Sequence, residues 1–104
     1  MKIDDVTLTL FKWDDIPETK YHAGAANAGG ESALGLLHIR TDEGIDGFSF
    51  LGSMNFGADM DCKGVIRTLK PLLMRQDPLD REALYQAMWK RSRITTFRAI
   101  GAVD

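Results

Sequence analysis

The sequence predicts an α+β domain in which a three-stranded antiparallel meander is followed by a helical bundle. Two patterns indicate this fold. Apolar and polar residues alternate in the N-terminal half of the chain, whereas apolar residues recur at helical spacing after Gly57. A chain of 104 residues has about the length of one domain, so both halves are expected to share a single core.

Three strands are expected, over residues 3–12, 33–41 and 45–51. In the first, Val6 and the apolar residues two and four positions later point to one side, as in a half-buried strand. The second and third are joined by a tight turn that ends at Gly44, which can adopt a positive φ. They therefore form an antiparallel hairpin.

The third strand carries two phenylalanines on one face. Phe48 and Phe50 alternate with Gly47 and Ser49, so the two rings point to the same side of the sheet. We expect a large apolar layer to cover them. The apolar stripe of the following helix is the natural cover.

Three helices are expected, over residues 58–74, 78–91 and 96–104. The first is predicted to kink or restart near Leu69 and Lys70, because Pro71 lacks an amide hydrogen and crowds the preceding turn. The apolar stripe of this helix comprises Cys62, Val65, Ile66, Leu69, Leu72 and Leu73.

The second and third helices have recognisable start signals. Asp77 is predicted to cap the second, with Pro78 in its first turn, and Thr95 or Thr96 to cap the third. The inner face of the second helix is predicted to comprise Leu79, Ala83, Leu84, Ala87 and Met88. The third helical pattern runs to Asp104 without a C-cap glycine or proline, which fits a fraying end and a truncated chain equally well.

One connection is much longer than a hairpin needs. Residues 14–32 separate the first two strands, and they are rich in glycine and alanine around Tyr21 and His22. Loops of this length are typical of lids and binding loops. Residues 52–57 form a shorter segment after the third strand, and the predicted topology places both segments at the same edge of the sheet.

Composition excludes several classes of function. A net charge of −2 and a pI near 5.6 argue against nucleic-acid binding, which needs clustered Lys and Arg. No apolar run approaches the length of a membrane span, so no membrane association is expected. A single cysteine, Cys62, is typical of a reducing compartment, and we expect a cytoplasmic protein.

A search for catalytic motifs finds none. The phosphate-binding glycine motifs are absent, and residues 59–70 resemble a calcium loop except that Lys63 and Lys70 occupy ligand positions. His38 is interpreted as an ordinary strand residue, whereas His22 lies in the long connection where ligands are commonly bound. We therefore expect no catalytic residue and no metal site in these 104 residues.

Three segments in this order resemble the N-terminal capping domain of the mandelate racemase/muconate lactonizing enzyme family of the enolase superfamily. They are Leu36-Leu37-His38-Ile39-Arg40-Thr41-Asp42-Glu43-Gly44-Ile45-Asp46-Gly47-Phe48, then Leu69-Lys70-Pro71-Leu72-Leu73 with Asp77-Pro78 close behind, and Arg98-Ala99-Ile100-Gly101-Ala102-Val103-Asp104. The resemblance spans nearly the whole chain. It implies a three-stranded meander with a helical bundle, and it implies that a C-terminal barrel domain is absent from this sequence.

The resemblance also implies a division of labour. In this family a Lys or His base removes the proton α to a carboxylate and Mg²⁺ stabilises the enediolate, with base and metal ligands in the barrel. The capping domain contributes loops that close over the substrate. The 104 residues alone are therefore expected to be inactive, and their implied partners are their own barrel, a small carboxylate substrate and, at full length, further copies in a homo-oligomer.

Transferred to this chain, the family loops fall on residues 14–32 and 52–56. The implied substrate-binding residues are Tyr21, His22, Asn27, Ser53, Met54 and Asn55. Because most of them are polar, they suit the hydroxyls of an acid sugar, which favours an acid-sugar dehydratase. The alternatives are a racemase, epimerase or cycloisomerase of the same family, or, from another class, a free-standing module that binds a ligand or a protein without catalysis.

Overall fold

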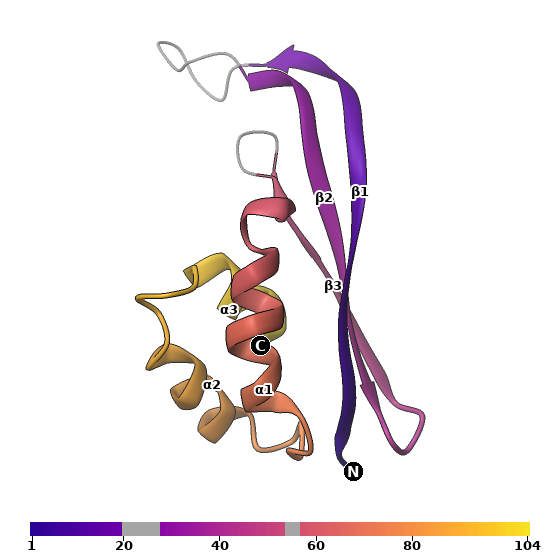
Figure 1. Ribbon diagram of the computed structural model, residues 1–104. Helices are drawn as coiled ribbons and strands as arrows, with labels where there is room; N and C mark the ends of the chain where they lie inside the picture. The colour runs from indigo at the N-terminus through magenta and orange to yellow at the C-terminus, as the bar shows by residue number, and fades with distance from the viewer. Residues whose placement is uncertain (20–27, 54–56) are drawn as a thin grey trace.

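A computed structural model describes residues 1–19, 28–53 and 57–104, and it confirms the α+β prediction. The sheet has the antiparallel order β1-β2-β3, and the helical segments pack on one of its faces (Figure 1). The strands are β1 (Ile3–Thr19), β2 (Ala28–Thr41) and β3 (Asp46–Leu51). The helical segments are η1 (Ala58–Met60), the π-helix η2 (Gly64–Leu69), α1 (Lys70–Leu73), α2 (Arg81–Trp89) and α3 (Phe97–Val103).

The core lies between the sheet and the helices. Val6 and Leu37 project from the sheet onto Val65, Leu69 and other apolar side chains of the helical layer, and all are buried. Each such side chain contributes about 1.5–3 kcal/mol on burial. The prediction that Val6 points inward from β1, and that Val65 and Leu69 lie on the inner stripe of the first helix, is therefore confirmed.

The prediction that a large apolar layer covers Phe48 and Phe50 is wrong. Both rings lie on the sheet face that carries no helices, and they are 63% and 74% exposed. The opposite side of β3 carries Gly47 and Ser49, and the Ser49 hydroxyl donates a hydrogen bond to the Ala102 carbonyl of α3 at 2.6 Å. At Ser49 the helix therefore lies close to the strand, and the large side chains of β3 point the other way.

The first two strands are longer than predicted. The ladder continues beyond Trp13↔Ser32 to Ile16↔Gly30 and Thr19↔Ala28, with a register shift before each of these last two pairs. Strand pairing is made by the backbone, so it extends through glycine and alanine, which give little sequence signal for a strand. Residues 14–19 and 28–32 are thus paired strand and not loop.

Near Leu69 and Lys70, where a kink or restart is predicted, the helix changes type without an interruption. The segment before Pro71 is a π-helix, in which the Lys70 amide donates to the Val65 carbonyl, and α geometry begins at Lys70. Pro71 cannot donate to a carbonyl, and its ring would crowd the carbonyl four residues earlier in an α-helix. The wider turn of the π-helix relieves this crowding.

The second helix begins later than predicted, at Arg81 and not at Pro78. The Asp77 carboxylate accepts a hydrogen bond from the Leu79 amide at 2.9 Å, so it caps a turn before the helix. Leu79 and Ala83 are exposed, contrary to the prediction, whereas Met88 is buried. The third helix follows the prediction: the Thr96 hydroxyl accepts from the Ala99 amide at 3.1 Å.

Two aspartates near the ends of the strands make the fold sensitive to acid. The Lys70 ammonium, 2.7 Å from the Asp5 carboxylate, lowers the pKa of Asp5, and the hydrogen bond with His38 at 2.8 Å lowers the pKa of Asp46. A depressed pKa in the folded state stabilises the fold above the ordinary aspartate pKa. This stabilisation is lost as the pH falls through the folded-state pKa.

We therefore expect the free energy of unfolding to fall as the pH drops below about 4. Urea unfolding followed by circular dichroism between about pH 2 and pH 6 measures this dependence. The Asp46→Asn variant should show a smaller fall than the unmodified chain. An identical pH dependence in both proteins would show that the Asp46 contact does not contribute.

Candidate functional site

The candidate site lies at the end of the sheet where the β1–β2 hairpin extends past the helices (Figure 1). Of the six residues that the sequence suggested, Ser53 is described by the structure and is exposed. The other five, Tyr21, His22, Asn27, Met54 and Asn55, lie outside the described residues.

The described flanks of the two candidate segments meet at this edge. The Ser32 hydroxyl of β2 donates a hydrogen bond to the Ser53 carbonyl at 2.6 Å. Ser32 belongs to the strand that follows the first segment, and Ser53 lies at the start of the second, next to Gly52. The structure thus brings together two parts of the chain that are 21 residues apart, as the predicted topology required.

Gly52 sets the direction in which the chain leaves β3. Its φ is +107°, a conformation that side chains rarely adopt, and a Cβ here would lie 2.6 Å from the Ala33 carbonyl oxygen. The same atom would lie 3.0 Å from the Ala58 amide nitrogen. Only glycine lets the backbone pass between β2 and η1 at this point.

A Gly52→Ala substitution is therefore expected to lower the free energy of unfolding by about 1–3 kcal/mol, through backbone strain and a clash with main-chain atoms. Thermal unfolding followed by circular dichroism measures the change. The control is Gly47→Ala on β3, where a Cβ would meet nothing within 4 Å. Equal stability of the two variants would contradict this account of Gly52.

A hollow of about 560 Å³ opens beneath the hairpin on the helical side of the sheet. Lys12, Glu31 and Asp59 provide charged groups on its wall, and Leu10 and Met60 provide apolar surface. The Lys12 ammonium lies 3.4 Å from the Glu31 carboxylate and 4.0 Å from that of Asp14. Such a wall can bind hydroxyl groups of a small polar molecule.

Sequence reasoning missed the charged residues of this hollow. Lys12 ends the predicted strand 3–12 and continues the alternation that places Val6 on the inner face, so its inward direction could have been predicted. Glu31 and Asp59 come together with it only through the fold, because no local pattern links β2 to η1.

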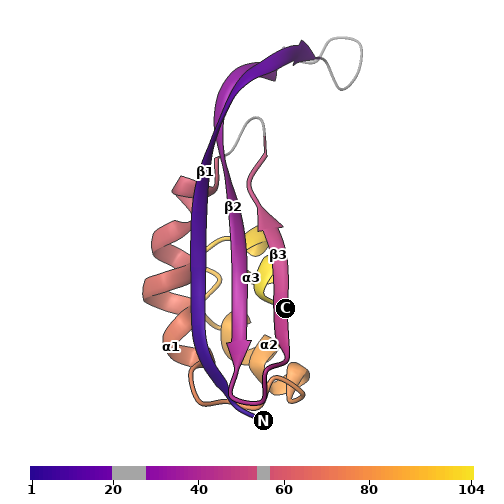
Figure 2. The same cartoon turned by 90° about the vertical axis from the view of Figure 1, so that its right-hand side faces the viewer.

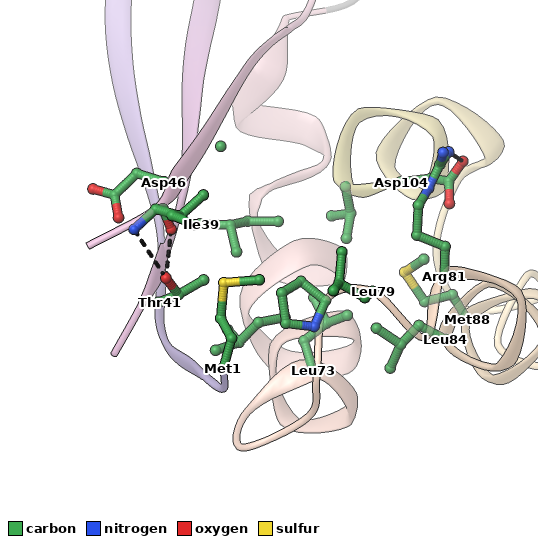
Figure 3. Close-up of a pocket in the computed structure, with 15 residues that line it drawn as sticks. Met1, Ile39, Thr41, Asp46, Leu73, Leu79, Arg81, Leu84, Met88 and Asp104 are labelled. Atoms are coloured by element: carbon green, nitrogen blue, oxygen red, sulfur yellow. Dashed lines mark hydrogen bonds and ion pairs between the residues drawn. The ribbon is translucent and has the colours of Figure 1, made fainter. Parts of the chain in front are cut away.

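A second cavity lies at the other end of the sheet and has a different character. It measures about 280 Å³, and its walls are core side chains such as Leu73, Leu84 and Met88 (Figure 3). Each polar side chain at its border already has a partner: Thr41 bonds to the Ile45 backbone, Asp46 to His38, and Arg81 to Asp104 at 3.0 Å. We therefore place the candidate site at the hairpin edge and not in this cavity.

The acidic pair Asp59 and Asp61 does not form a cation site. Asp61 is buried, and its carboxylate accepts hydrogen bonds from the Thr96 hydroxyl at 2.8 Å and from Arg98 Nε at 2.6 Å. In the part of the chain that the structure describes, no three His, Cys, Asp or Glu side chains come close enough to hold a metal ion. None of the described helices is long and apolar enough to span a membrane.

Several solved enzyme structures contain a domain with the same fold as this chain. A racemase from Streptomyces coelicolor A3(2) with bound magnesium matches with a TM-score of 0.77 and 21% identity, over 97% of this chain and 29% of its own. A mandelate racemase/muconate lactonizing enzyme matches with a TM-score of 0.71 and 17% identity, over 98% and 27%. D-glucarate dehydratase from Agrobacterium tumefaciens, complexed with magnesium, matches with a TM-score of 0.66 and 23% identity, over 95% and 25%.

These matches show the fold: the chain has the architecture of the N-terminal domain of mandelate racemase and related enolase-superfamily enzymes. It spans between a quarter and a third of the length of the three structures described above. No family model and no curated protein matches the sequence.

Proposed function

We propose that this chain is the N-terminal capping domain of a longer, Mg²⁺-dependent enzyme of the mandelate racemase/muconate lactonizing enzyme family, and that this enzyme is an acid-sugar dehydratase. The observation that carries the proposal is the meeting of the described flanks of the two candidate segments at one sheet edge, joined by the Ser32–Ser53 hydrogen bond, in a fold shared with such enzymes.

The proposed reaction begins with removal of the proton α to the substrate carboxylate, followed by loss of a hydroxyl group from the β carbon. Magnesium supplies stabilisation of the enediolate when it is bound. The described residues of this chain do not fit a magnesium site, so we assign the metal ligands and the base to a C-terminal barrel. This chain takes no part in moving the proton.

The proposed role of the chain is to cover the substrate and select it. Tyr21, His22 and Asn27 from the first segment, with Ser53, Met54 and Asn55 from the second, are proposed to contact the substrate. Closure over the substrate excludes water from the enediolate. Polar side chains that bond to substrate hydroxyls reject analogues that lack them, because a buried polar group would then be left unpaired.

A racemase, an epimerase or a cycloisomerase is the second candidate, and the likeness to a racemase with bound magnesium favours it. All these reactions share the enediolate, and residues of the barrel decide whether a proton returns or a hydroxyl leaves. The polar character of the proposed contact residues favours the dehydratase. We propose a cytoplasmic homo-oligomer, in keeping with the single cysteine of the sequence.

The test uses the full-length protein that carries residues 1–104. It is incubated in D₂O with Mg²⁺ and a panel of aldonic and aldaric acids, and NMR follows exchange of the α proton and formation of the dehydrated keto acid. We expect exchange and dehydration with at least one acid, and loss of both when EDTA removes the metal. Absence of both α-proton exchange and dehydration across the panel would contradict the proposal.

A further inference from the structure

The hollow of about 560 Å³ beneath the hairpin carries a surplus of negative charge. Among the described residues that line it, Lys12 supplies the single positive charge, whereas Glu31 and Asp59 supply two carboxylates. The Lys12 ammonium is already shared, because it lies 3.4 Å from the Glu31 carboxylate and 4.0 Å from that of Asp14. Asp59 forms no ion pair with any residue that the structure describes. At neutral pH the hollow therefore presents carboxylate oxygens that no cation neutralises.

The strand register directs these charges to one face of the sheet. Lys12 is paired with Ala33, and Asp14 and Glu31 each lie two positions from one member of this pair. Positions two apart in a strand point to the same side, so the three charged side chains share the helical side of the sheet. Asp59 approaches the same side from η1, and the wall of the hollow thus combines charges from three elements.

The hollow adjoins both segments that are proposed to cover the substrate. β1 and β2 continue side by side past the end of β3, so the wall that they form leads to the first segment (Figure 2). Ser32 lines the hollow and donates the hydrogen bond to the Ser53 carbonyl in the second segment. Gly57 also lines the hollow and directly follows residues 52–56. A substrate held beneath these segments would therefore have one end against the hollow.

The charge of the hollow distinguishes two classes of acid sugar. Both carry a reacting carboxylate at one end, but the other end is a primary alcohol in an aldonic acid and a second carboxylate in an aldaric acid. An alcohol donates a hydrogen bond to a carboxylate oxygen, and such charge-assisted bonds are stronger than neutral ones. A second carboxylate has no proton to donate at neutral pH, and Glu31 and Asp59 repel it.

We propose that the hollow selects aldonic acids over aldaric acids, and that Glu31 and Asp59 determine this specificity. The inference rests on the proposed function and deepens it, because it names the class of acid sugar. Glu31 and Asp59 accept hydrogen bonds from substrate hydroxyl groups and reject a second negative charge. They act on the end of the substrate that is remote from the reacting carboxylate, so they take no part in proton transfer.

The test compares matched pairs of acids in the full-length, Mg²⁺-loaded enzyme. Gluconate and glucarate, galactonate and galactarate, and mannonate and mannarate differ only at the carbon farthest from the reacting carboxylate. In the pair that the enzyme uses best, we expect kcat/KM to be at least about tenfold higher for the aldonic acid. An acid that is not turned over is compared by its inhibition constant against the best acid. If the enzyme turns over none of the six acids, isothermal titration calorimetry gives their dissociation constants instead.

The double variant Glu31→Gln/Asp59→Asn removes two charges and keeps the shape of both side chains. It should reduce the preference for the aldonic acid at least about fivefold, because the repulsion is removed and Lys12 loses one of its partners. The matched control Asp80→Asn/Glu82→Gln makes the same chemical change at two exposed residues at the start of α2, and it should leave the preference within about twofold. Raising the salt concentration from about 20 mM to about 500 mM should reduce the preference of the unmodified enzyme, because salt screens charges, but not that of the hollow variant.

The outcomes separate this inference from the proposed function. Preference for the aldaric acid, or an unchanged preference in the Glu31→Gln/Asp59→Asn variant, would overturn the inference even if the enzyme dehydrates acid sugars. Preference for the aldonic acid in binding, without α-proton exchange or dehydration, would support the inference and contradict the dehydratase. Binding of none of the six acids would overturn both.

Discussion

Replacing His22, Asn27 and Asn55 together with alanine is expected to lower kcat/KM of the full-length enzyme for its acid-sugar substrate by about a hundred- to a thousandfold. Each side chain is proposed to bond to a substrate hydroxyl that is shielded from water, and each lost bond costs about 1–1.5 kcal/mol. Steady-state kinetics with the best acid of the panel measures the change.

The matched control replaces Glu82 and Gln86 of α2 with alanine. Both are exposed polar residues of the same domain, remote from the hairpin edge, and kcat/KM should stay within about twofold of the unmodified enzyme. Thermal unfolding of both variants verifies that the domain is intact. An unchanged kcat/KM in the triple variant, for every acid turned over, would remove the loop assignment.

Arg98→Ala is expected to lower the free energy of unfolding by about 3–5 kcal/mol. The Asp61 side chain has no exposed surface, and Arg98 Nε donates to it at 2.6 Å. Without the guanidinium, a buried carboxylate would keep only the Thr96 hydroxyl as its side-chain donor among the bonds described above. Urea unfolding at neutral pH measures the loss.

Arg81→Ala is the matched control, because it breaks an ion pair of the same chemical type at the surface. Arg81 is 68% exposed and bonds to Asp104 at 3.0 Å. Solvent screens such a pair, so its loss should cost no more than about 1 kcal/mol. Similar losses in the two arginine variants would show that the burial of Asp61 does not determine the effect.

Periodicity predicted the parts of this fold that depend on burial along a single element. The helical stripe through Val65 and Leu69 and the inward direction of Val6 are examples. Phe48 and Phe50 were placed on the wrong side because α3 contacts β3 through Ser49, and the sequence does not show which face the helices cover. Alternation of apolar residues shows which side chains share a face of a strand, but it does not show whether helices or solvent cover that face.

The candidate site was predictable only in outline. Antiparallel topology alone placed the segments around Ser32 and Ser53 at one edge, and the hydrogen bond between them agrees. The charged wall formed by Lys12, Glu31 and Asp59 could not be predicted, because its members come from three elements that no local pattern relates. The extension of β1 and β2 through small residues could not be predicted either. Strands pair through backbone hydrogen bonds, which form whatever the side chains are.

The most direct measurement of the central claim, that this domain touches and selects the substrate, is a double cycle on the full-length enzyme. It compares kcat/KM for an acid sugar and for its analogue lacking one hydroxyl, in the unmodified enzyme and in His22→Ala, Asn27→Ala and Asn55→Ala separately. We expect at least one pair in which the deletion of the hydroxyl and the loss of the side chain are coupled by about tenfold or more. If the effects of the missing hydroxyl and of the substitution were independent within about twofold for all three variants, the claim that this domain selects the substrate would be contradicted.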